Sequence, residues 1–364
     1  MIENIVIVGN GFDCWQGLQT SYASFQSYYL KHRDEILRNL RIKPTEVSEK
    51  GRVVSKISAV ELIYGDYEDF GELDDTFWST YENSLADIDD ESINLFFGKS
   101  KSDLKWMRRT VRNCLKILHT AFSHWIATIE IDSRESEYDF GDNTLFINFN
   151  YTDTLVKRMG IDPEKEYHIH GEATNPESII VGHSEHPEYP SPLQKRIGGR
   201  FEGLYILETL LFETDKHVMD NIQWLTLFLA ENGAIAEEIK NVYVLGHSFG
   251  KADLAYFAFL VNCTTVEKSE MPKINLDAAK ERLIQEQEER NKDIQGMILK
   301  HLGATEEDMR NWKAPEHRTQ DAQWHISYHT LEDKTRIEEV MRQLGCTNYQ
   351  LFPSIEECIE RFKR

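Results

Sequence analysis

Short apolar runs alternate along the chain with longer stretches in which apolar residues recur at helical spacing. Continuous apolar runs are typical of strands buried on both faces, whereas a helical period is typical of amphipathic helices. Strands are predicted at 5–8, 144–149, 166–169, 178–182, 241–246, 324–328 and 347–352. Helices are predicted at 20–40, with Ser21 or Thr20 as the cap, at 204–217, 220–238, from 253 onward, at 331–344 and at the C-terminal end.

Strands that alternate with helices require right-handed crossovers and form a mostly parallel sheet with helices on both faces. We therefore predict an α/β, Rossmann-like fold and a single domain over residues 1–364. Residues 51–131 keep a helical, acidic pattern, which predicts a helical insertion ending in one long amphipathic helix over 104–131. A second, charged helical insertion is predicted at 270–318, where a helix at 277–302 mixes Glu and Lys and suits a solvated face or a partner surface.

Composition narrows the classes of protein that the chain can belong to. The 62 acidic residues against 41 basic ones give a net charge of −21, which argues against general attraction to nucleic acid or anionic membranes. No apolar run approaches the roughly 20 residues that a spanning helix needs. The five cysteines are scattered, without a Cys-x-x-Cys pair, which suits a reducing cytoplasm and provides no zinc site. We expect a cytoplasmic protein without a metal.

The first strand ends in the glycine-containing turn Gly9-Asn10-Gly11-Phe12-Asp13. A buried strand followed by two glycines and a helix lets backbone N–H groups approach an anion, and the helix N-terminus adds partial positive charge. The turn lacks the third glycine of the usual dinucleotide fingerprint. Glycines at this point also suit a turn that only needs a positive φ, so both interpretations remain open.

Three later strands also end in polar residues. The segments are 144–153, 167–171 and 242–253, which end in Asn-Tyr-Thr-Asp, His-Gly and Gly-His-Ser-Phe-Gly-Lys-Ala-Asp. In an open parallel sheet, ligands bind beyond the carboxyl ends of the strands. We therefore expect the polar residues of all four strands to meet in one crevice.

Asn150 and His170 are the strongest candidates for chemistry at this edge. The amide of Asn150 offers a donor and an acceptor, so it can hold a sugar hydroxyl and orient a water molecule. His170 has a ring nitrogen that can take a proton from a ribose hydroxyl near pH 7. His168 would share its face of a continuing strand, but Gly171 gives the backbone room beside His170 and favours it. Asp153 suits the cap of the next helix.

Two other kinds of site compete with this interpretation. Gly246-His247-Ser248-Phe249-Gly250 matches the Gly-x-Ser-x-Gly elbow of serine hydrolases, with Ser248 as nucleophile. No glycine-rich oxyanion loop precedes this elbow, and the available acids lie mostly in charged helical sequence. The triad partners would come from Asp277, Asp293 or Asp308 and from His317, His325 or His329.

A metal site is the other competing hypothesis, because two histidines two residues apart on a strand can chelate. The candidate ligands are His168, His170, His183, His186 and His247, with Glu172 or Glu185. No third ligand has a recognisable spacing, so we expect no metal.

Several motifs in order resemble the AbiH family of bacteriophage abortive-infection proteins. They are Gly9–Asp13 with Gly17–Phe25, Asn148–Thr152, His168–Gly171, Ile180–His183, Gly246–Phe249 with Asp253, and Trp324–Tyr328. AbiH motifs are in turn similar to those of sirtuin-like, NAD-consuming domains of bacterial anti-phage systems, which have a Rossmann-type fold. The resemblance implies an anti-phage protein that binds NAD and hydrolyses the bond between nicotinamide and ribose.

The resemblance also assigns roles to single residues. Asn150 would serve the nicotinamide ribose, and His170 would be the catalytic base. Because cleavage builds positive charge at the ribose, we further expect Asp13 to hold a hydroxyl or to stabilise that charge. Gly9 and Gly11 would belong to the phosphate loop, and Gly246, Ser248 and Asp253 would contact the far end of the dinucleotide. We expect the adjoining residues Asn10, Phe12, Asp153 and His247 to bind the nucleotide as well. Asn10 stands where sirtuins carry a small residue, and Phe12-Asp13 replaces a small hydroxyl pair, so a related nucleotide remains an alternative ligand. The chain lacks the four-cysteine zinc module of sirtuin deacetylases, which argues against deacetylation.

An uncontrolled NAD consumer would harm its own cell, so we expect a repressed state. Its release would come through homo-oligomerisation, a defence partner protein or a phage-derived trigger, with one of the two insertions as the contact. The alternative from another class is a nucleotide-binding sensor or scaffold of a defence complex that does not turn its ligand over.

Overall fold

A computed structural model of the whole chain describes residues 1–49, 52–65, 73, 81–85, 104–133, 136–175, 178–182, 216–234, 238–264 and 322–364. The predicted charged insertion at 270–318, the helix at 277–302 and most of the predicted helix at 204–217 lie outside these residues.

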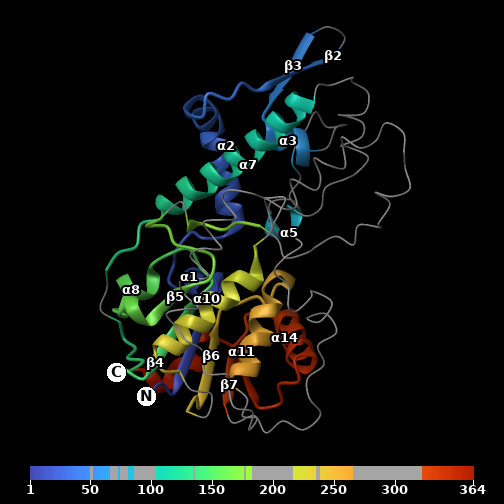
Figure 1. Cartoon of the computed structure of the whole chain (residues 1–364). Coiled ribbons are helices and arrows are strands. Elements are labelled where there is room, and N and C mark those ends of the chain that lie inside the picture. Colours follow the sequence, from blue (N-terminus) through green and yellow to red (C-terminus); the bar gives the residue numbers. More distant parts are fainter. Residues whose placement is uncertain are drawn as a thin grey trace, which may run out of the picture.

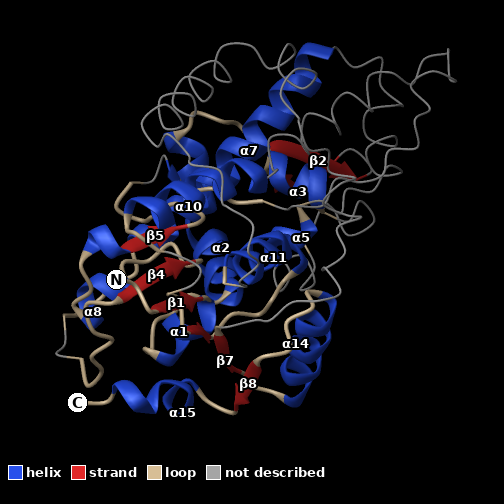
Figure 2. Ribbon diagram, turned by 60° about the horizontal axis from the view of Figure 1, so that its bottom comes forward, coloured by secondary structure: helices blue, strands red, loops and turns tan. Residues whose placement is uncertain are grey.

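A six-stranded parallel sheet organises the described residues (Figures 1 and 2). Across the sheet the strands are β5 (Glu166–His168), β4 (Thr144–Asn148), β1 (Asn4–Val8), β6 (Asn241–Leu245), β7 (Gln323–Ser327) and β8 (Tyr349–Phe352). Numbered by their appearance in the chain, these strands have the order 3-2-1-4-5-6, which is that of dinucleotide-binding Rossmann folds. The predicted α/β, Rossmann-like fold is confirmed.

Alternating side chains of the central strands enter two different cores. Ile5 and Ile7 of β1 belong to one core, and Val6 and Val8 belong to the other. The first core includes residues of α10 (Val218–Glu231), α11 (Leu254–Cys263) and α14 (Leu331–Gln343). The second includes residues of α1 (Asn10–Trp15), α8 (Thr154–Met159) and α15 (Ile355–Ile359). Helices therefore cover both faces, which explains the continuous apolar runs of β1 and β4.

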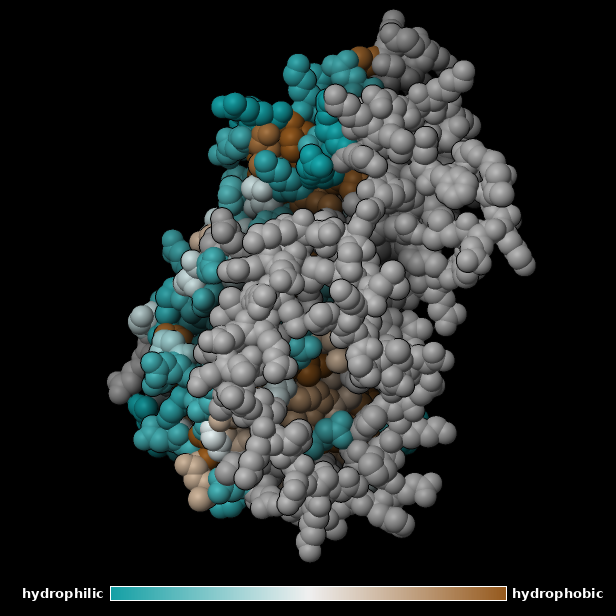
Figure 3. Space-filling model, in the orientation of Figure 1, coloured by the Kyte–Doolittle hydropathy of each residue, from teal (hydrophilic) through white to brown (hydrophobic). Residues whose placement is uncertain are grey.

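A third core lies in a helical lobe, in the upper part of Figure 1. Its helices are α2 (Tyr22–Asn39), α3 (Ala59–Tyr64), α5 (Tyr81–Ser84) and α7 (Leu104–Ala127). Ser21 caps α2, as predicted, because its hydroxyl accepts a hydrogen bond from the Ser24 amide. Figure 3 shows apolar side chains at the surface around α2 and α7, bordered by hydrophilic ones.

The predicted helical pattern over residues 51–131 is wrong at its start. β2 (Thr45–Glu49) and β3 (Arg52–Ile57) pair as an antiparallel hairpin. Val53 and Val54 are β-branched and favour strands, and the preceding strand provides a pairing partner.

The predicted strand at 178–182 is also absent. Ile180 donates a backbone hydrogen bond to His170 at 2.9 Å, but no strand is assigned to the segment. Ile179 is instead buried in the core of the helical lobe, which accounts for the apolar run. Of the other expected helices, α10 ends at Glu231 rather than residue 238, and α7 ends at Ala127 rather than residue 131.

Candidate functional site

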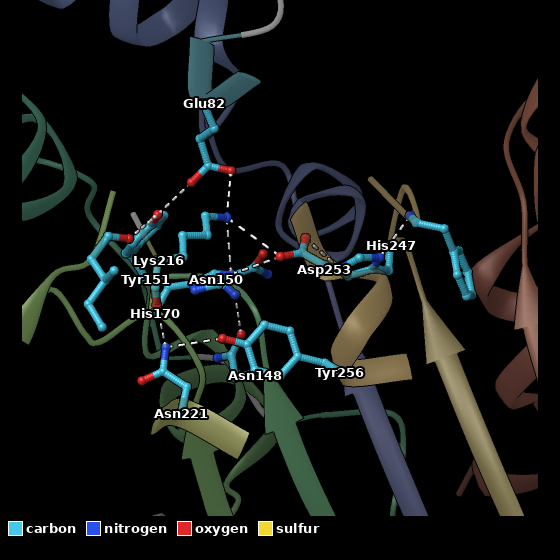
Figure 4. Close-up of polar contacts among 12 residues, drawn as sticks. Glu82, Asn148, Asn150, Tyr151, His170, Lys216, Asn221, His247, Asp253 and Tyr256 are labelled. Carbon is cyan, nitrogen blue, oxygen red and sulfur yellow. Dashed lines mark hydrogen bonds and ion pairs between the residues drawn. The ribbon is translucent and has the colours of Figure 1, made fainter. Parts of the chain in front are cut away.

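The turns that follow β1, β4, β5 and β6 meet at the carboxyl edge of the sheet. The Asn150 side-chain amide donates to the Gly9 carbonyl at 3.0 Å, and the Gly11 amide donates to the Gly246 carbonyl at 2.8 Å. His170, which follows β5, lies 3.3 Å from the carboxylate of Asp253, which follows β6. Residues that follow four separate strands thus form one connected polar region (Figure 4).

Close packing of two turns requires glycine at several of these positions. A Cβ atom on Gly9 would lie 2.7 Å from the His247 Cα atom, and one on Gly246 would lie 2.3 Å from the Phe12 nitrogen. Gly246 also has φ of +64°, which disfavours a side chain. The amides of Gly9, Gly11 and Phe12 each donate to a backbone carbonyl. The glycines are therefore explained by the contact of the two turns, without reference to a ligand.

Asp13 is a buried acid in α1, with an exposed fraction of 1%. Its Oδ2 accepts a hydrogen bond from the Thr152 hydroxyl at 2.6 Å, whereas its Oδ1 has no partner among the described residues. Burial raises the pKa of Asp13 to about 6, against the opposing effect of the hydrogen bonds from Thr152, Thr154 and Asn150. The carboxyl group therefore changes its charge close to physiological pH.

Asn150 connects the turn after β4 to the turn after β1. Besides the bond from its side chain to Gly9, its backbone amide donates to the Asn148 Oδ1 atom at 2.7 Å. Its carbonyl lies 3.0 Å from the His168 Nδ1 atom. Asn150 is buried, and its side-chain NH₂ group already holds the glycine turn in place.

His168 and His170 have different surroundings, because β5 ends at His168 and the backbone turns before His170. His168 Nε2 lies 3.2 Å from Glu166 Oε1, and its other nitrogen faces the Asn150 carbonyl. Burial opposes protonation of His168, but Glu166 and the Asn150 carbonyl together raise its pKa. His168 therefore stabilises the Asn150 turn, and His170 faces the rest of the site.

Three buried residues, His170, Lys216 and His247, form a charge cluster with the half-buried carboxylates of Glu82 and Asp253 (Figure 4). Lys216, which is completely buried, places Nζ 3.0 Å from Glu82 Oε2, 3.5 Å from Asp253 Oδ1 and 3.4 Å from His170 Nε2. Asp253 also contacts both histidines, with Oδ1 3.3 Å from His170 Nε2 and Oδ2 3.4 Å from His247 Nε2.

The cluster sets the charges of its own members. Burial would raise the pKa of Asp253, but Lys216 and the hydrogen bonds from the two histidines hold it well below its usual value. Burial would lower the pKa of Lys216, but Asp253 and Glu82 raise it. Burial and the charge of Lys216 lower the pKa of His170. At neutral pH the site therefore contains a neutral His170 between an ionised acid and an ammonium group.

Glu82 and Lys216 were not identified from the sequence. Glu82 lies in α5 of the helical lobe, and Lys216 comes just before α10, in a segment whose pattern predicted a helix. They are 134 residues apart in the chain, and each is a single charged residue without a motif. No local signal in the sequence pairs them.

Ser248 does not have the surroundings of a hydrolase nucleophile. Its side chain is exposed, and its carbonyl accepts a hydrogen bond from Arg336 Nε at 2.9 Å. The positive φ values of this turn fall on Gly246 (+64°) and Phe249 (+53°) rather than on the serine. His247 is bonded to the Phe249 amide and to Asp253, so it is not directed at Ser248. Asp277, Asp293, Asp308 and His317 lie outside the described residues.

The remaining candidate residues lie apart from the cluster. Asp153 precedes α8 without a side-chain cap bond and forms an ion pair with Lys157 at 2.9 Å. Within the described ranges, no group of three or more His, Cys, Asp or Glu residues could hold a metal ion. His183, Glu185 and His186 are outside those ranges. None of the helices in the described part of the chain is long and apolar enough to cross a membrane.

Comparison with known proteins identifies the family. The model of the family described as "Bacteriophage abortive infection AbiH" matches residues 5–272, which include every turn of the site and end before the Trp324–Tyr328 motif. No curated protein matches the chain, and no solved structure does. The match covers well over half of the sequence, including the turns that follow β1, β4, β5 and β6. The chain therefore belongs to the AbiH family of bacteriophage abortive-infection proteins.

Proposed function

We propose that this AbiH protein acts against phage by binding NAD, or a closely related nucleotide, at the carboxyl edge of its sheet and hydrolysing the bond between nicotinamide and ribose. The observation that carries the proposal is His170, a buried, neutral imidazole whose Nε2 faces Asp253 and whose Nδ1 has no partner among the described residues. Such a nitrogen is suited to accept a proton from a sugar hydroxyl.

The strand order supports a nucleotide as the ligand. From β1 the chain adds β4 and β5 on one side of the sheet, and it then crosses back to add β6, β7 and β8 on the other side, so the strand order reverses between β1 and β6. In open α/β sheets, ligands bind beyond the carboxyl ends of the strands at such a switch point. The turn 9–13 would face the phosphates, with Gly246, His247, Ser248 and Asp253 on the other side of the switch point. Asn10 and Ser248 have exposed side chains that could contact the ligand directly.

The charges of the site suit cleavage of a glycosidic bond to nicotinamide. Departure of nicotinamide builds positive charge at the anomeric carbon of the ribose, and nearby carboxylates stabilise that charge. Glu82 and Asp253 lie within the cluster, and Asp13 adds a carboxylate once the pH exceeds about 6. In the proposal His170 is the base, Asp13 stabilises the developing charge, and Asn150 positions the ribose through its turn.

The burial of His170, only 3% exposed, supports a repressed state. Lys216 contacts the base, and Glu82 of the helical lobe holds Lys216. A substrate could reach His170 only after part of this cover moves. We propose that homo-oligomerisation, a defence partner or a phage-derived trigger causes that movement in the cytoplasm.

A nucleotide sensor without turnover is the second candidate. It is favoured by the amides of Gly9, Gly11 and Phe12, which are bonded to protein carbonyls rather than directed toward a phosphate. A sensor would be stabilised by NAD against thermal unfolding and would leave the ligand intact.

The test measures NAD cleavage and thermal stability on the same purified protein, with and without extract from phage-infected cells. We expect H170Q to lower NAD turnover by about 100-fold or more, because general base catalysis contributes at least that much. The same variant should retain stabilisation by NAD. N150A should lose both, because its side chain holds the Gly9 turn. H124Q, a change at an exposed histidine of α7, is the matched control.

Turnover that H170Q and N150A both retain would refute the assignment of the site. Stabilisation by NAD with no turnover under any condition would favour the sensor. If NAD neither stabilises the protein nor is cleaved, then NAD is not the ligand.

A further inference from the structure

We propose that Asp253 and His247 are positioning residues that fix the proton of His170 on Nε2 and leave Nδ1 as the only proton acceptor of the ring. The inference rests on the proposed function for the role of Nδ1 as base, but the tautomer itself is a property of the unliganded protein. It gives Asp253 and His247 a role distinct from contact with a nucleotide.

The chain of hydrogen bonds begins at a backbone amide. The Phe249 N–H group donates to His247 Nδ1 at 2.9 Å, so this nitrogen must be unprotonated. The proton of a neutral His247 is therefore on Nε2, which lies 3.4 Å from Asp253 Oδ2. A backbone amide cannot act as an acceptor, so the direction of this first bond is fixed.

The second carboxylate oxygen sets the tautomer of His170. Asp253 is ionised and can only accept hydrogen bonds, so His170 Nε2, 3.3 Å from Oδ1, must carry the proton. Lys216 Nζ, 3.4 Å from the same nitrogen, would favour the opposite tautomer. That arrangement would place a nitrogen lone pair against an anionic oxygen. The ammonium group of Lys216 does not require His170 Nε2 as an acceptor, because Glu82 at 3.0 Å and Asp253 at 3.5 Å already compensate its charge.

Aromatic rings surround the rest of His170. The rings of Phe149, Tyr151 and Tyr256 have centroids 5.6, 6.2 and 6.1 Å from that of the imidazole. The Tyr151 hydroxyl lies 3.0 Å from Glu82 Oε1, and the Tyr256 hydroxyl accepts a hydrogen bond from the Asn221 amide at 3.0 Å. Neither hydroxyl has a hydrogen bond to His170 Nδ1, which has no partner among the described residues. The ring is thus held at one nitrogen and free at the other.

The tautomer determines where a proton can go. A substrate hydroxyl transfers its proton to the Nδ1 lone pair, which leaves the electron pair of the broken O–H bond on the sugar oxygen. The ring becomes a cation with a proton on each nitrogen. Its positive charge faces Asp253 through the Nε2–H group, and Glu82 adds a second nearby carboxylate. With the opposite tautomer Nδ1 would be a donor and could not act as base.

The direct test is ¹⁵N NMR of the histidine rings in the unliganded full-length protein, with H170Q used to identify the His170 signals. At pH 7.5 we expect a neutral His170 ring with the proton on Nε2. In D253L the acceptor is absent and Lys216 can donate to Nε2, so the proton should move to Nδ1. A proton on Nδ1 in the wild-type protein, or an unchanged tautomer in D253L, would overturn the proposal.

Kinetics provide a second measurement once turnover has been established. We expect D253L to lower kcat by about 100-fold, with KM changed much less, because the Nδ1 lone pair that acts as base is lost. H247F should lower kcat by about 10-fold, by analogy with the residues that orient metal-binding histidines through a hydrogen bond. A wild-type kcat in D253L would overturn the positioning role of Asp253, and a wild-type kcat in H247F would overturn that of His247. Because the NMR result does not need NAD, failure of the proposed function and failure of this inference can be distinguished.

Discussion

Asp13 is expected to make the stability of this protein depend on pH in a direction opposite to that of an ion-paired acid. Burial raises its pKa in the folded state to about 6, whereas an Asp in an unfolded chain has a pKa of about 3.9. Between these two values the folded protein retains a proton that the unfolded chain has lost. The free energy of unfolding therefore decreases as pH rises through this window, by about 1.4 kcal/mol per pH unit.

The variant D13N keeps the shape of the side chain and cannot ionise. An unpartnered amide group at this position would cost about 1–3 kcal/mol, but that cost does not change with pH. The informative quantity is therefore the difference in stability between variant and wild type. The window from pH 4.5 to pH 6 spans about 1.5 units. Over this window the free energy of unfolding of D13N should rise by about 2 kcal/mol relative to that of the wild type, and the difference should stay constant above pH 7.

Urea unfolding of both proteins at several pH values between 4.5 and 8 measures this difference. D34N is the control for a change of one charge, because the Asp34 side chain is 85% exposed. A difference between D13N and wild type that stays constant over the range would refute the argument from burial. In the proposed mechanism D13N also lowers NAD turnover, so the variant would trade activity for stability at neutral pH.

Three further predictions concern the packing and charges of the site, each measured by urea unfolding. G246A should lose about 3 kcal/mol or more of unfolding free energy, because φ is +64° and the new Cβ would lie 2.3 Å from the Phe12 nitrogen. The control G160A has a similar φ of +69° but no atom within 4 Å of the new Cβ, so it should lose only about 1 kcal/mol. K216M should lose about 3–5 kcal/mol, because it removes the ammonium group that Glu82 and Asp253 share, and a loss below 1 kcal/mol would contradict the ion pairs. The raised pKa of His168 stabilises the fold at low pH, so that contribution should disappear as pH rises through the folded value; H168Q should lack this dependence.

The sequence by itself determined the sheet and the edge at which the site lies. The apolar runs of β1, β4 and β6 are buried between two layers of helices, so the runs themselves indicate strands of a parallel sheet that is covered on both faces. Because the carboxyl ends of parallel strands lie at one edge, it also predicted that Gly9, Asn150 and His170 approach one another. The β2–β3 hairpin could not be recognised as readily, since its pairing depends on a partner segment rather than on local periodicity.

Only the tertiary structure decided which groups surround His170. Asp253 is 83 residues away from it in the chain, and Lys216 and Glu82 are 134 residues apart. Each is a single charged residue whose effect depends on distance and burial rather than on its neighbours in sequence. The tautomer of His247 is likewise set by one backbone amide at 2.9 Å. A residue pattern can place polar groups at an edge, but their charges and proton positions follow from contacts that exist only in the folded chain.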